Sequence, residues 1–108
     1  MGDLEFKIKN TLEAFLIAYL ESRISGADHN LSVGLASVRV ESIFPDSKDY
    51  VKVISSVFKN NKTIRKILED YTMSMMTEVA GIIISKVSDL IAKKFDLFFE
   101  EILREITR

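Results

Sequence analysis

The C-terminal stretch, residues 62–106, constrains the fold more than any other part of the chain. It contains no proline and a single glycine, Gly81. Its apolar residues recur every three or four positions, the period of an amphipathic helix: Ile64, Leu68, Tyr71, Met75, Val79, Ile82, Leu90, Phe98 and Ile102. Because Gly81 weakens a helix and Ser85 or Ser88 can cap one, we expect either one bent helix or two helices separated between Gly81 and Ser88.

Two further helices are predicted upstream. Asp3 is the expected N-cap of a helix over residues 4–25, which Gly26 ends. Pro45 ends the following segment, and a short helix is predicted over residues 48–59. Together these elements indicate an all-α fold: one helical domain over residues 1–108, built as a small bundle of four to five helices with a long C-terminal helical region.

Residues 31–44 fit two structures. Leu31, Val33 and Leu35 alternate with small or polar residues, which favours a strand. Leu31, Leu35 and Val38 fit one face of a helix equally well. No second strand is predicted elsewhere, so a strand here would have to pair with itself or with a second copy of the chain. Helix is therefore favoured for Leu31–Phe44, and strand is the alternative.

The residue inventory argues against catalysis. Cysteine is absent, which excludes disulfides, thiolate chemistry and cysteine-ligated metals. The only histidine, His29, follows Asp28 in a predicted loop, where we expect it to be solvated. The sequence contains no Gly-x-Ser-x-Gly elbow, P-loop, EF-hand or His-Glu-x-x-His motif. We therefore expect a protein that is not an enzyme, with no catalytic residues, no metal site and no bound cofactor.

Several features bear on location and source. The first ten residues are charged, unlike a signal peptide. The longest apolar runs, Ala14–Leu20 and Val79–Ile84, are shorter than the ~20 residues that span a bilayer. Carboxylates interleave with Lys93, Lys94 and Phe95, which disfavours a membrane-surface anchor there. A soluble, cytoplasmic protein is expected.

The absence of glutamine and cysteine is typical of a thermophile, which suggests an archaeal source, although an AT-rich genome explains it equally.

One segment is basic between two acidic ones. Residues 47–66 hold six lysines and arginines against one acidic residue. A helix, a short turn and a second helix give the outline of a helix-turn-helix, and four cations would gather at the start of the second helix, where the helix dipole favours phosphate: Lys59, Lys62, Arg65 and Lys66. Glu69 and Asp70 follow within one turn, so a solvated lysine-rich corner is the simpler interpretation. A nucleic-acid-associated regulator is the alternative function.

A second apolar stripe lies on the other side of the long helical region. It consists of Met73, Met76, Ala80, Ile83, Val87 and Ile91. One apolar face can meet the protein's own core, and the other needs further cover. Methionine is adaptable and frequent at association surfaces. The stripe therefore predicts a homodimer or higher oligomer whose partner is the chain itself, with another protein as a further partner. A pocket for an apolar ligand and burial within one monomer are the alternatives.

Overall fold

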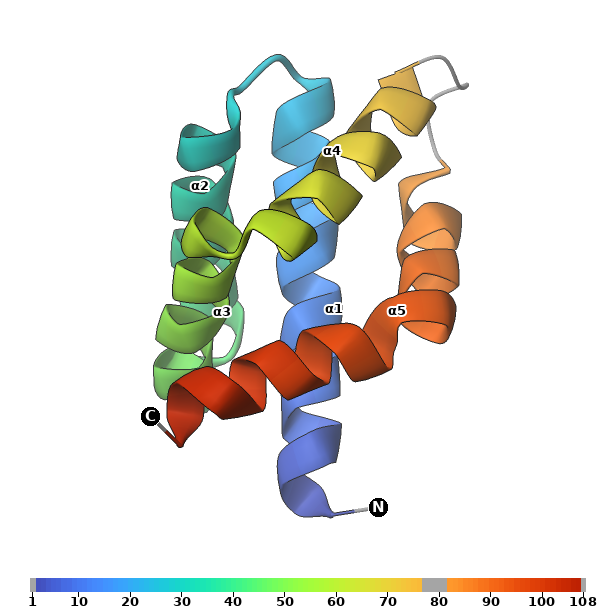
Figure 1. Ribbon diagram of the computed structural model, residues 1–108. Coiled ribbons are helices and arrows are strands. Elements are labelled where there is room, and N and C mark those ends of the chain that lie inside the picture. Colours follow the sequence, from blue (N-terminus) through green and yellow to red (C-terminus); the bar gives the residue numbers. More distant parts are fainter. Residues whose placement is uncertain (1, 77–81, 108) are drawn as a thin grey trace.

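The computed structural model describes residues 2–76 and 82–107, and these form five α-helices with no β-strand among them. The all-α prediction is confirmed. The helices form a bundle (Figure 1). Their order is α1 (Asp3–Ile24), α2 (His29–Ile43), the 3-10 turn η1 (Pro45–Ser47), α3 (Lys48–Asn60), α4 (Lys62–Met76) and α5 (Ile83–Ile106).

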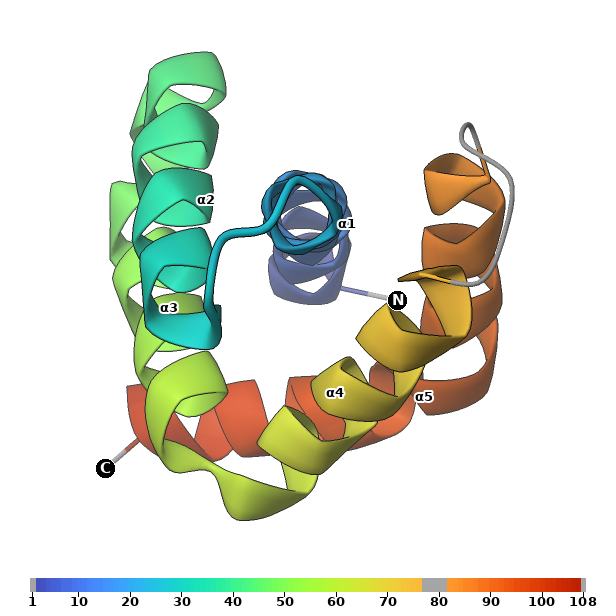
Figure 2. The ribbon, with the colours of Figure 1, turned by 90° about the horizontal axis from the view of Figure 1, so that it is seen from above.

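Helix α1 is the centre of the bundle. Viewed from above, α2 and α3 lie on one side of it, and α4 and α5 enclose it on others (Figure 2). All four of these helices contact α1. This position explains why the middle of α1 is largely apolar, since the other helices cover most of it and leave only one face, with Ala14 and Ile17, partly buried. Phe15, Leu16, Tyr19 and Leu20 are all fully buried there.

Aromatic side chains join three of the helices in the core. The ring of Phe58 in α3 lies 4.9 Å from that of Phe15 and 5.8 Å from that of Tyr19, both in α1. It also lies 5.9 Å from the ring of Phe98 in α5. The two contacts with α1 are edge-to-face, and contacts of this kind add about 0.5–1.5 kcal/mol each to the gain from burial. Phe58 is therefore the residue through which α1, α3 and α5 pack together.

The segment from 31 to 44 is helical, so the favoured prediction is confirmed and the strand alternative is wrong. Gly26 ends α1 with a φ of 106°, a left-handed conformation that favours glycine. Asp28 then caps α2, because its carboxylate accepts a hydrogen bond from the Leu31 amide at 2.8 Å. Pro45 follows the end of α2 and begins η1.

The long helical region consists of two helices. Helix α4 ends at Met76 and α5 begins at Ile83. The start of α5 at Ile83 falls within the predicted interval, and Gly81 itself lies outside the described residues. Ser85 and Ser88 lie inside α5, so they do not cap it. Helix α5 changes direction along its length (Figure 1), and its later turns pack against α1 and α3.

One cap is misplaced in the sequence-based prediction. Gly2 occupies the cap of α1 without a side-chain hydrogen bond, and Asp3 is the first helical residue. An acidic residue in the first turn still favours the helix through its dipole.

Candidate interaction surface

Helix α2 is apolar on two opposite sides. The side facing the bundle contributes Val33, Ala36 and Val40 to the core, all with no exposed surface. The side facing away exposes three aliphatic side chains, Leu31, Leu35 and Val38, which are 54%, 48% and 69% exposed. Their spacing places them in one line along the helix. Together with Gly34, which lies between them, these residues are termed the α2 stripe.

Gly34 has no role within its own chain that requires a glycine. A Cβ atom placed on it would meet nothing within 4 Å, and its backbone φ is not positive. A glycine inside a helix costs about 1 kcal/mol relative to alanine. Leu31, Gly34, Leu35 and Val38 have the spacing of the four residues that surround a hole for a side chain of a second helix. The glycine deepens that hole.

The charges near the α2 stripe lie at its ends. No Lys, Arg, Asp or Glu occurs between His29 and Val38. Asp28 caps the amino end of α2. Arg39, near the carboxyl end, donates to a carboxylate oxygen of Glu21 in α1 at 2.7 Å. The stripe is thus a neutral surface, with the Asp28 carboxylate at one end and the Arg39–Glu21 pair and Glu41 near the other.

The predicted oligomer seam is divided by the structure. Met73 and Met76 are 66% and 57% exposed near the end of α4, whereas Val87 and Ile91 are only 1% and 6% exposed. Ile83 is half-buried and packs against the core, and Ala80 lies outside the described residues.

Val87 and Ile91 were therefore wrongly assigned to an exposed seam, since both belong to the core of their own chain. The physical reason is the separation between α4 and α5. A stripe with a constant period stays on one side of the molecule only along an uninterrupted helix, and α4 and α5 turn their faces independently.

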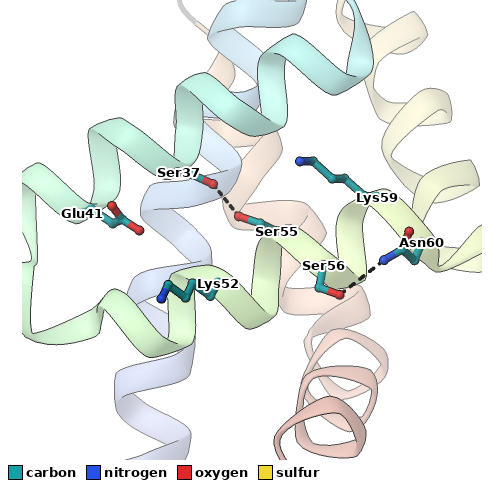
Figure 3. Close-up of a pocket in the computed structure, with 7 residues that line it drawn as sticks. All are labelled: Ser37, Glu41, Lys52, Ser55, Ser56, Lys59 and Asn60. Atoms are coloured by element: carbon teal, nitrogen blue, oxygen red, sulfur yellow. Dashed lines mark hydrogen bonds between the residues drawn. The ribbon is translucent and has the colours of Figure 1, made fainter.

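The predicted basic corner is also divided. Lys59 lines an open polar groove of about 420 Å³ between α2 and α3 (Figure 3). Lys62 and Lys66 line a different hollow together with Asp70, whose carboxylate lies 3.9 Å from the Lys66 ammonium. Arg65 is exposed on α4. The four cations stay near one another in the chain, but they do not line one shared hollow.

The groove beside Lys59 is polar and open. Its other lining residues are Ser37, Glu41, Lys52, Ser55, Ser56 and Asn60. The Ser37 and Ser55 hydroxyls hydrogen-bond to each other across the two helices, and the Asn60 amide donates to the Ser56 hydroxyl at 3.3 Å (Figure 3). These side chains largely satisfy one another or solvent, so the groove resembles an ordinary helix–helix junction at the surface.

His29 is buried, and the prediction of a solvated loop histidine was wrong. Only 5% of the residue is exposed, because the Asp28 cap makes it the first residue of α2 and turns it inward. Its Nε2 lies 3.0 Å from the Phe58 carbonyl oxygen and its Nδ1 lies 2.8 Å from the Tyr19 hydroxyl. A carbonyl only accepts, so Nε2 carries the proton and Nδ1 accepts from Tyr19.

Burial sets the ionisation of this pair. It lowers the pKa of His29 below its ordinary value of 6.5 and raises the pKa of Tyr19 to about 12. Both groups are therefore neutral near pH 7, and their hydrogen bonds tie α2 to α1 and α3. This is a structural arrangement, with no access for a substrate.

The described residues, 2–76 and 82–107, hold no group of three metal-ligating side chains that could bind an ion. Within the same ranges, every helix is too short or too polar to cross a bilayer. No protein-family model, curated protein or solved structure matches the chain.

Proposed function

We propose that this chain is a non-enzymatic interaction protein that acts by associating with a second copy of itself. The observation that carries the proposal is the α2 stripe, in which three aliphatic side chains lie exposed in one line along a helix. The exposed Met73 and Met76 on α4 add a second apolar surface. Contiguous exposed apolar surface with a polar surround marks association sites, because covering it removes apolar area from water.

The polar groups of the described surface support binding over catalysis. His29 is enclosed, and its two ring nitrogens are engaged by Tyr19 and by the Phe58 carbonyl. The groove lined by Ser37 and Ser55 has no buried acid or base facing it. A general acid–base mechanism needs such a group within hydrogen-bond reach of a substrate.

A nucleic-acid-associated regulator is the second candidate, supported by the exposed cations Lys59, Lys62, Arg65 and Lys66. Against it, Asp70 lies beside Lys66 and the cations line separate hollows. About four phosphate contacts would give weak binding that salt abolishes. A dimer would present two such corners.

Sedimentation equilibrium of the purified chain, run with and without nuclease treatment, tests both candidates. Self-association predicts an average mass that rises from monomer to dimer with concentration and is unaffected by nuclease. A monomer mass at every concentration contradicts it. A larger mass that nuclease reduces to the monomer supports the nucleic-acid candidate, which further predicts a gel shift at low salt that disappears as salt is added.

A further inference from the structure

We infer that the α2 stripe packs against the α2 stripe of a second copy, with the two helices antiparallel about a two-fold axis that passes between residues 34 and 35. The inference rests on the proposed self-association and specifies which surface is used and in which orientation. It assigns the contact to α2 and leaves Met73 and Met76 outside it.

The shape of the stripe favours this pairing. In an antiparallel pair centred between residues 34 and 35, Leu31 faces Val38 of the partner and Leu35 faces the partner's Gly34. Leu35 then enters the hole between the partner's four stripe residues, where the missing Cβ of Gly34 leaves open space. Both the projecting leucine and the glycine that receives it lie on the same helix face, so the surface is complementary to itself, as a two-fold contact requires.

The helix dipoles favour the antiparallel orientation, because it sets the amino end of one α2 beside the carboxyl end of the other. The side-chain charges do not choose between the orientations, since Arg39 is paired with Glu21 of its own chain and Glu41 lies near the same end of the helix. The flanking Glu21, Asp28 and Glu41 disfavour an anionic lipid surface as the occupant.

The size of the surface predicts a weak dimer. Three half-exposed aliphatic side chains supply less than the ~800 Å² per partner of a typical stable interface. Ile24 lies just before the amino end of α2, and Ile43 and Phe44 lie at its carboxyl end, and all three are exposed. The antiparallel pairing brings these opposite ends together and so extends the contact. A concentration-dependent dimer is expected rather than a permanent one.

Disulfide trapping tests the geometry, since the chain contains no cysteine of its own. Leu35→Cys lies beside the two-fold axis and should form a covalent dimer on mild oxidation. Ser42→Cys is exposed on the same side of α2 but would be ~22 Å from its symmetry mate along the antiparallel helices, so it should not. An equal mixture of Leu31→Cys and Val38→Cys should give the mixed disulfide, whereas each variant alone should not.

Efficient trapping of Ser42→Cys would overturn the antiparallel orientation, because only parallel helices place that residue opposite its mate. Absence of trapping for both Leu35→Cys and the Leu31→Cys/Val38→Cys mixture would overturn the α2 contact.

Substitutions that block the contact separate this inference from the proposed function. Gly34→Leu fills the hole, and it should stay folded by circular dichroism because Gly34 is exposed and a Cβ there meets nothing within 4 Å, while dimerisation should weaken at least ~10-fold. Leu35→Glu should be monomeric at concentrations where the wild type is dimeric. Met76→Glu is the matched control on the other apolar surface and should dimerise like the wild type.

The outcomes are distinguishable. Loss of the dimer in Met76→Glu with retention in Gly34→Leu and Leu35→Glu would overturn the α2 contact and leave self-association standing. A wild type that stays monomeric at all concentrations would overturn both.

Discussion

Helices α2 and α3 lie side by side and have similar lengths of 15 and 13 residues, yet their outer faces differ in composition. In α3 the inward side is apolar and the outward side carries charged residues such as Lys48 and Asp49. In α2 both sides are apolar. Helix α3 has the pattern that is usual for a surface helix, with an apolar side toward the core and a polar side toward solvent. The bundle covers the inward faces of both helices, whereas the outer face of α2 is apolar and exposed, and the proposed self-association rests on that difference.

The largest expected effect is on the inward side of α3. Phe58→Ala should lower the free energy of unfolding by about 3–5 kcal/mol, because the ring is fully buried among Phe15, Tyr19 and Phe98. Urea denaturation monitored by circular dichroism measures this change. The matched control on the outer side of α2, Leu35→Ala, should change the stability of the dilute monomer by no more than about 0.5 kcal/mol. Equal losses at the two positions would contradict the distinction between inner and outer faces.

The next effect concerns the polar link between α2 and the bundle. Tyr19→Phe removes the hydroxyl that donates to His29 and leaves a buried ring nitrogen without this partner. The expected loss is about 1–3 kcal/mol in the free energy of unfolding. The matched control is Tyr50→Phe in α3, which is half-buried and should cost less. If Tyr19→Phe left the free energy of unfolding unchanged, the hydrogen bond would contribute nothing to the packing of α2 against the bundle.

Two glycines should respond in opposite directions to the same substitution. Gly34→Ala should stabilise the dilute monomer by about 1 kcal/mol, because alanine favours a helix and its Cβ meets no other atom. Gly26→Ala should destabilise by about 1–2 kcal/mol, because φ is +106° there. Thermal denaturation at low concentration compares them. Destabilisation by Gly34→Ala in the monomer would show that the glycine serves its own chain.

The last prediction is a pH dependence of stability. Because burial lowers the pKa of His29 in the folded chain, the unfolded chain binds more protons between that lowered value and 6.5. The contribution of neutral His29 to stability is therefore complete above pH 6.5 and is lost as the pH falls through the folded-state pKa. Arg23, Arg65 and Glu69 act on the same ring more weakly than its burial.

Urea denaturation across this pH range should show that the free energy of unfolding of the wild type declines as the pH falls. His29→Asn should lack the part of this decline that comes from the histidine. An identical pH profile in the two proteins would contradict the account of a neutral, buried histidine.

Local signals explain which parts of the fold were predictable. Gly26, Pro45 and the cap at Asn61, which accepts a hydrogen bond from the Ile64 amide at 3.0 Å, act within a few residues along the chain. They set the helix limits regardless of the rest of the molecule. The shared helix face of Leu31, Leu35 and Val38 could also be predicted from their spacing alone.

The errors came from long-range packing. His29 is buried because Tyr19 of α1 and Phe58 of α3 contact it. The residues next to His29 in the sequence give no sign of these contacts. Val87 and Ile91 face their own core because α5 is separate from α4. Glu69 follows Arg65 by one turn of α4, yet its carboxylate pairs with the Arg23 guanidinium of α1, with 3.0 Å between Oε1 and Nη2. Periodicity reports which residues share a helix face, and tertiary packing decides what that face meets.

A dilution series followed by two-dimensional NMR tests the central claim most directly, because it observes both helices in one sample. We expect the amide signals of Leu31, Gly34 and Val38 to shift with concentration, while that of Asp49 on the outer side of α3 does not. Signals of α2 that are unchanged across the whole concentration range, or shifts confined to Met73 and Met76, would contradict it.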